Sequence, residues 1–209
     1  MRNWVLSSCL AVIAGSAGCA TAPSGPAVHY AGEPFDLEQR PGRISGQVCG
    51  MDLMLDVQER AGDVQLTGFI DGRVAVELNG KDEADGRRVT GRIGSNAGSS
   101  AVDVKLTPVA LTGRVGFRHF DLHASPTPGD DTLAGTMRIA GAQDPAEARI
   151  DGRSKLVALS PAVQAALVPT LLECNVQRIG QWGRSSLLVR VGGPAGALPH
   201  ESSALYTHD

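Results

Sequence analysis

Apolar and polar residues alternate along most of the chain between Ile44 and about Ser154, and a glycine recurs within that alternation. The recurring unit is an apolar residue, a small or polar residue, glycine, any residue and a second apolar residue. Its five copies start 22, 23, 22 and 22 residues apart, at Ile44–Val48, Leu66–Ile70, Val89–Ile93, Leu111–Val115 and Leu133–Met137. A near-constant spacing of this length is typical of one structural unit repeated along the chain.

The stretch from Val64 to Leu78 shows the alternation most clearly, because every second residue is apolar or glycine. Successive side chains of a strand point to opposite faces, so the apolar residues and the glycines share one face. This pattern predicts a half-buried antiparallel strand, and Gly68 and Gly72 would permit a sharp bend in it. Each unit is therefore either one long bent strand or a two-strand hairpin.

The repeated units predict a mainly β fold, in which an antiparallel meander forms a curved sheet or a small barrel. We expect polar turns at Glu59–Asp63, Asn79–Arg88 and Ser125–Asp131, and a loop at Gly94–Ser100. A parallel β-solenoid with coils of about 22 residues is the alternative. A row of inward glycines would leave a trough in the core face, to be filled by a helix of the chain or by an apolar ligand.

The pattern changes at Ser160, where one helix is expected over about residues 161–178. Ser160 suits the N-cap and Pro161 the first helical position. Apolar residues lie on most sides of this helix, which indicates wide burial, and Pro169 should kink or split it. The helix is the obvious filler of the glycine trough. Ser186–Val191 reads as one more strand.

The N-terminus has the layout of a secretory signal, with Arg2 followed by an apolar stretch and then small residues. Its end, Ser16-Ala17-Gly18-Cys19, resembles the lipobox of bacterial lipoproteins. The resemblance implies cleavage after residue 18, acyl chains on Cys19 and, because Ala20 follows, sorting to the outer membrane, with the domain in the periplasm or at the cell surface. The alternative is an ordinary cleaved signal in which Cys19 is incidental.

These features predict the following domain organisation: a signal peptide at 1–18, a lipidated cysteine with a flexible tether at 19–43, one β-rich domain at 44–191 and a loose tail at 192–209. Four prolines in the tether exclude a helix there. The net charge of -3 provides no basic field, which argues against nucleic acid as a partner.

Two of the four cysteines, Cys9 and Cys19, belong to the signal and the lipid site. Cys49 and Cys174 remain in the folded part, and in an oxidising compartment the simplest expectation is a disulfide between them. Two buried thiols are the alternative.

No catalytic, metal or cofactor site is assigned from the sequence. His119, Asp121 and His123 share one strand face, but residues four apart on a strand are about 13 Å apart, too far for both histidines to bind one ion. We expect a solvated outer face there. A set of arginines could form a mildly positive outer patch, but each is expected to be solvated: Arg73, Arg87, Arg88, Arg92 and Arg114.

The sequence thus predicts a non-enzymatic envelope lipoprotein, held to the membrane by its N-terminal lipid, whose β-rich domain has a binding or structural role toward another envelope component. Its ligand-binding residues stay unassigned. One alternative is a carrier or sensor of a small apolar ligand in the β-domain interior. Another is an envelope hydrolase with a site assembled across strands.

Overall fold

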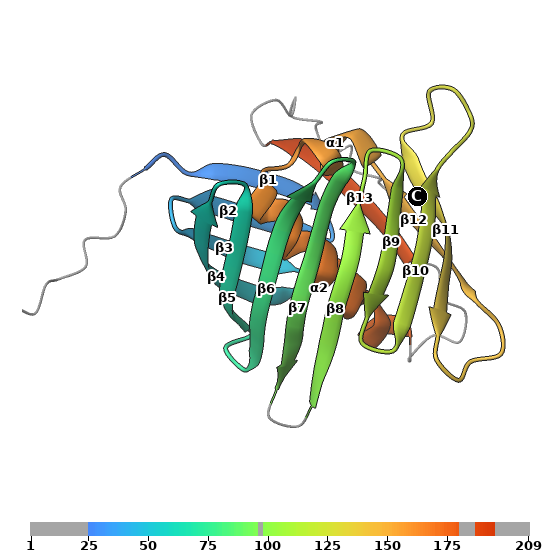
Figure 1. The fold of residues 1–209 in the computed structure, drawn as a ribbon, viewed down its shortest axis with the longest axis horizontal. Coiled ribbons are helices and arrows are strands. Elements are labelled where there is room, and N and C mark those ends of the chain that lie inside the picture. Colours follow the sequence, from blue (N-terminus) through green and yellow to red (C-terminus); the bar gives the residue numbers. More distant parts are fainter. Residues whose placement is uncertain (1–24, 96–97, 180–186, 195–209) are drawn as a thin grey trace, which may run out of the picture.

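The computed structural model describes residues 25–95, 98–179 and 187–194, and the side chains of 25–94 and 98–173. Twelve strands follow one another, each antiparallel to the next, and a short helix, a long helix and a last strand complete the fold (Figure 1). The strands of the meander are β1 (Val28–Glu33), β2 (Phe35–Arg40), β3 (Arg43–Val48), β4 (Met51–Arg60), β5 (Asp63–Ile70), β6 (Val74–Glu83), β7 (Gly86–Ser95), β8 (Gly98–Leu106), β9 (Ala110–Val115), β10 (Arg118–Ala124), β11 (Thr132–Ile139) and β12 (Ala146–Asp151).

The remaining elements are α1 (Arg153–Ala158), α2 (Pro161–Ile179) and β13 (Leu187–Pro194). Strand β13 pairs in parallel with β12 and antiparallel with β1, so the order of hydrogen-bonded strands closes into a barrel. The antiparallel meander predicted from the repeats is confirmed. The solenoid alternative is wrong, because consecutive strands of a solenoid sheet would run parallel.

Each 22-residue unit is a two-strand hairpin, and the single bent strand proposed for Val64–Leu78 is wrong. Asp71 and Gly72 interrupt it with φ values of 50° and 63°, and the Arg73 N–H donates to the Ile70 carbonyl oxygen at 3.1 Å. Asp-Gly with both φ angles positive is the preferred type I′ turn of a hairpin. Gly72 therefore serves the turn, and β5 and β6 are separate strands.

The recurring glycines face inward, as predicted, but the cause of their recurrence differs from the prediction. A Cβ on Gly46, Gly68, Gly91, Gly113 or Gly135 would overlap a backbone carbonyl oxygen of the preceding strand. Directly across from each glycine, that strand carries a large buried side chain: Leu37, Leu55, Leu78, Val104 or Leu122. The close approach is thus between neighbouring strands within the sheet, and it recurs once per hairpin because every hairpin packs on the previous one alike.

Helix α2 fills the interior of the barrel, as predicted for the helix at about 161–178. All side chains from Ala162 to Leu172 are buried, and the helix contacts β3, β4, β5, β6 and β9. The Val163 N–H donates to the Ser160 Oγ at 3.2 Å, which confirms Ser160 as N-cap. Pro169 lies inside the continuous helix. One glycine outside the repeat does serve helix packing, because a Cβ on Gly80 would lie 3.0 Å from the Ala165 Cβ.

Several predicted boundaries are wrong. The tether predicted at 19–43 contains β1 and β2, which belong to the barrel, since prolines exclude helix but are tolerated at strand ends. Strands also extend into the turn predicted at Asn79–Arg88 and the loop predicted at Gly94–Ser100. Strand β13 continues to Pro194, into the predicted tail, and helix α1 was not predicted. Residues 1–24 and 195–209 lie outside the described residues.

Candidate functional site

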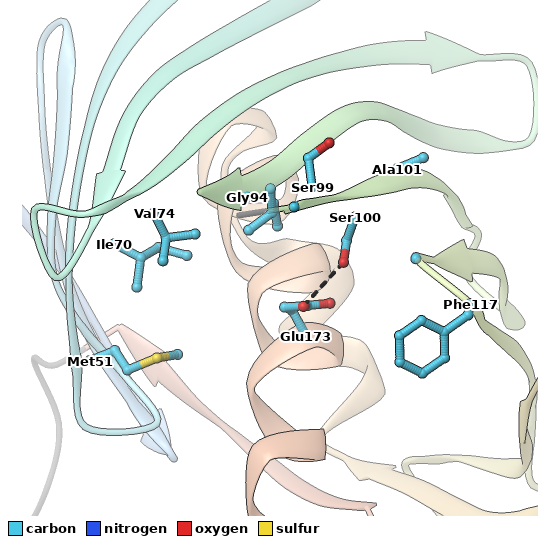
Figure 2. A pocket seen from close by; sticks show the side chains of 12 residues that line it. Met51, Ile70, Val74, Gly94, Ser99, Ser100, Ala101, Phe117 and Glu173 are labelled. Carbon is cyan, nitrogen blue, oxygen red and sulfur yellow. Dashed lines mark hydrogen bonds between the residues drawn. The ribbon is translucent and has the colours of Figure 1, made fainter. Parts of the chain in front are cut away.

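A cavity of about 640 Å3 opens at the barrel end where the turns β3–β4, β5–β6 and β9–β10 meet the C-terminal half of α2. We call it the mouth pocket. Figure 2 shows apolar side chains on the strands around it and Glu173 on α2. Its lining consists of Met51, Ile70, Val74, Ile93, Gly94, Gly98, Ser99, Ser100, Ala101, Gly116, Phe117 and Glu173.

One charged side chain, Glu173, lies among the lining residues of the mouth pocket. The Ser100 Oγ donates to Glu173 Oε1 at 3.3 Å, and the Arg118 Nη1 donates to Glu173 Oε2 at 3.2 Å. The side chain of Glu173 is 25% exposed, whereas that of its partner Arg118 is only 8% exposed. The carboxylate thus faces the pocket, and the guanidinium lies behind it.

Burial of the Arg118 guanidinium in the protein interior is energetically unfavourable. Burial lowers the pKa of its guanidinium, and the neighbouring Glu173 carboxylate opposes that shift. The Nε atom is buried, and no hydrogen-bond partner for it occurs among the described residues. The guanidinium carbon lies 4.7 Å from the centroid of the Phe117 ring, which is itself half exposed at the pocket rim. A buried ion pair with an incomplete hydrogen-bond set is weak evidence for stability, so this pair is a candidate for function.

A second buried arginine, Arg87, lies at the opposite end of the barrel. Its Nη2 is paired with Asp82, and its buried Nη1 has no hydrogen-bond partner in the described part of the chain. A cavity of about 500 Å3 lies beside it, between the β6–β7 turn and the start of α2. There the side-chain amide of Gln164 donates to three carbonyl oxygens at the end of α1, those of Leu156, Val157 and Leu159. These hydrogen bonds hold the end of α1 against α2.

The outer-face prediction for His119, Asp121 and His123 is confirmed, because all three side chains are exposed on β10. The His123 Nε2 lies 2.9 Å from Asp121 Oδ1, a local contact along the strand. No group of three or more metal-ligating side chains occurs among the described residues.

The predicted arginine patch splits between two environments. Arg88 is on the outer face and donates to both Asp103 oxygens at 2.8 and 2.9 Å. Arg73, Arg92 and Arg114 are also outside the core. The expectation that Arg87 is solvated is wrong, because its parity places it on the inner face with Val89.

Sequence reasoning missed Arg118 and Glu173, although a signal for each was present. Arg118 shares the inward parity of Phe120 and Leu122 on β10. Glu173 is the one charged residue in the stretch 162–173 of α2, and the other residues of that stretch are uncharged and buried. A charge at an inward or all-buried position is the pattern that could have found them.

Cys49 lies in the β3–β4 turn, packs against the core, and has a bonded partner. Cys174 belongs to α2, but its side chain lies outside those described, so their pairing stays a prediction. Glu173, the residue before Cys174, lines the same pocket as Met51, two residues after Cys49. The two cysteines thus belong to segments at the same end of the barrel.

Cys19 lies outside the described residues, so the lipidation site also stays a prediction. Within the part of the chain that is described, no helix is both long enough and apolar enough to cross a bilayer. The chain matches no family model, no curated protein and no solved structure.

Proposed function

We propose that this chain is a lipid-anchored protein of the bacterial envelope whose β-barrel is a non-enzymatic binding module. The observation that carries the proposal is the combination of a lipobox-like sequence ending at Cys19 with a plugged barrel that holds the mouth pocket beside Glu173. A largely apolar pocket with a few polar groups is the usual form of a binding site. The partner in this proposal is another component of the envelope.

The start of β1 and the mouth pocket lie at opposite ends of the barrel. Val28, at the start of β1, pairs with Gln39 beside the β2–β3 turn, whereas the mouth pocket includes Met51 beside the β3–β4 turn. Only nine positions separate Cys19 from Val28, a span of at most about 30 Å. An anchored barrel would therefore present the mouth pocket away from the membrane, toward envelope components in the aqueous space.

A second candidate function is the carrier or sensor of a small apolar ligand. The mouth pocket favours it, but the ligand site would differ from the one expected from the sequence. The barrel interior is occupied by α2, whose side chains from 162 to 172 are buried. A ligand would therefore have to sit at the mouth, beside Glu173, and not in the centre of the β domain. The volume of about 640 Å3 suits a molecule of modest size.

The hydrolase alternative finds little support in the mouth pocket. A serine nucleophile needs a general base within hydrogen-bond reach. The carboxylate next to Ser100 is already engaged by the Arg118 guanidinium, whose Nη1 donates to Glu173 Oε2 at 3.2 Å. No histidine is among the described residues that line the pocket.

Membrane fractionation tests the anchor. The wild-type chain should be recovered with outer membranes and carry acyl chains by mass spectrometry, and Cys19→Ser should release it as a soluble protein. Recovery of unmodified wild-type chain in the soluble fraction would contradict the anchor.

Site-specific photocrosslinking tests the pocket. A crosslinker placed at Gly98, which lines the pocket on the inner face of β8, should capture a defined envelope component, whereas one at Gln65, exposed on the outer face of β5, should not. Equal capture from both positions would contradict a binding role for the mouth pocket.

A further inference from the structure

The mouth pocket combines an apolar wall with one accessible carboxylate. Its apolar part comes from Met51, Ile70, Val74 and Ile93 on the strand ends, and Glu173 projects from α2 toward Ser100 on the other side (Figure 2). An apolar wall with one carboxylate matches an amphipathic molecule, which has an apolar part and a polar head group. The carboxylate of Glu173 then determines which head group can bind.

Glu173 retains hydrogen-bond acceptor capacity. An ionised carboxylate has about four acceptor positions, and the described residues use one on each oxygen, for Ser100 and for Arg118. The side chain is a quarter exposed, and it lines the pocket, whereas Arg118 does not. A molecule in the pocket therefore meets acceptor oxygens and not the guanidinium.

The negative charge of Glu173 determines which head groups the pocket prefers. A head group that donates a hydrogen bond to a carboxylate gains a charge-assisted interaction. An anionic head group would bring two negative charges together in a partly desolvated pocket, which disfavours binding. Because Arg118 compensates the carboxylate from behind, a neutral donor is sufficient and a full positive charge is not required.

We propose that the mouth pocket binds a small amphipathic molecule with an apolar body and a hydrogen-bond-donating head, an amine or a hydroxyl, and that Glu173 receives the head. This inference rests on the proposed binding function and names the ligand class for its second candidate. Arg118 and Ser100 act as positioning residues that hold the Glu173 carboxylate toward the pocket.

Gly98 provides a way to block the pocket without disturbing the barrel. It shares the inward parity of Ser100 and Val102, and a Cβ there would meet no atom within 4 Å. Gly98→Leu therefore places an apolar side chain into open pocket space. Gln65→Leu adds the same residue on the exposed outer face of β5 and serves as the matched control.

The test uses the chain from residue 19 onward with Cys19→Ser, so that no detergent is needed. N-phenyl-1-naphthylamine, an apolar probe with an N–H donor, should bind and gain fluorescence, and 1-decanol, decylamine and decanoate compete for it at neutral pH. We expect decylamine and 1-decanol to displace the probe at concentrations about tenfold or more below those required for decanoate. Gly98→Leu should weaken probe binding at least tenfold, and Gln65→Leu should leave it unchanged.

The double variant Arg118→Met with Glu173→Leu tests whether Glu173 causes the preference among head groups. It keeps the pocket apolar and leaves no unpaired charge, so the probe should still bind while the preference among the three decyl compounds disappears or reverses. Absence of probe binding to the wild-type chain, equal displacement by the three compounds, or an unchanged preference in the double variant would each overturn the inference. A chain that fails these tests but still anchors through Cys19 and captures an envelope component from Gly98 retains the proposed function.

Discussion

Gly91 of β7 lies so close to Glu77 of β6 that a Cβ on the glycine would overlap the Glu77 carbonyl oxygen and lie 2.9 Å from the Leu78 Cα. Its φ angle of 145° is also one that side-chain-bearing residues rarely adopt. The same relationship to the preceding strand recurs in the other repeats. The near-constant spacing of about 22 residues is therefore the spacing at which one hairpin meets the next.

Gly91→Ala should destabilise the protein by about 3 kcal/mol or more, because backbone atoms cannot move aside as a side chain can. Urea unfolding followed by circular dichroism measures the change. Gly98→Ala is the matched control within a strand: with no atom within 4 Å of its Cβ position, it should change the unfolding free energy by less than about 1 kcal/mol. Equal losses in the two variants would contradict the steric explanation.

The contact between Gly80 and Ala165 gives a second prediction, on helix packing. Ala165 is fully buried and would lie 3.0 Å from a Cβ on Gly80. Ala165→Leu should overpack the interior and lower the unfolding free energy by about 1–3 kcal/mol, again measured by urea unfolding. Lys155→Leu, at an exposed position on α1, is the control and should have little effect. A neutral Ala165→Leu would mean that α2 is packed more loosely on β6 than this distance indicates.

The sequence allowed the repeat, the meander and the plugging helix to be predicted, because each depends on a regular pattern of side chains. It did not locate β1 and β2, where the short alternation of Tyr30, Phe35 and Leu37 is interrupted by Pro34. The role of Gly72 was also missed, because a glycine in a turn and a glycine at a bend in a strand would occupy the same position of the alternating pattern. Arg118 and Glu173 are 55 positions apart, so their meeting depends on the closure of the sheet around α2 and on no local pattern.

Asp131 gives a prediction on pH. Its carboxylate accepts hydrogen bonds from the Ser154 Oγ at 2.6 Å and the Ser154 N–H at 2.8 Å, at the start of α1. The hydroxyl of Ser154 is the main cause that lowers the pKa of Asp131 below its usual 3.8. A carboxyl with a depressed folded-state pKa contributes stability above its unfolded-state pKa and loses that contribution as pH falls through the folded-state value.

The Asp131 contribution is therefore complete well above pH 3.8 and is lost progressively as the pH falls below that value. Because the side chain is more than a third exposed, we expect it to be below about 1 kcal/mol. Urea midpoints measured from pH 6 to pH 3 should fall less steeply for Asp131→Asn than for the wild-type chain. Parallel curves would show that this contact does not contribute to the acid sensitivity.

The predicted Cys49–Cys174 disulfide would join the β3–β4 turn to α2 across about 126 residues. Proteolysis without reductant followed by mass spectrometry should yield one crosslinked peptide that contains both cysteines. Cross-linking a loop of this length restricts the unfolded chain, so reduction should lower the unfolding free energy by up to about 4–5 kcal/mol. Two alkylatable thiols in the unreduced protein would disprove the pairing.

The ion pair at the mouth pocket gives the last prediction. Glu173→Leu leaves the Arg118 guanidinium buried without its compensating charge and should cost about 2–3 kcal/mol. Arg118→Met leaves a carboxylate that is a quarter exposed and can be hydrated, so its cost should be smaller. The double variant Arg118→Met with Glu173→Leu should recover to within about 1 kcal/mol of the wild-type chain, because an apolar pair can replace a buried ion pair. Chemical denaturation of the four proteins forms a double-mutant cycle. If the double variant were less stable than either single variant, the pair would be a structural requirement of the barrel, and the case for its role in binding would lose its physical basis.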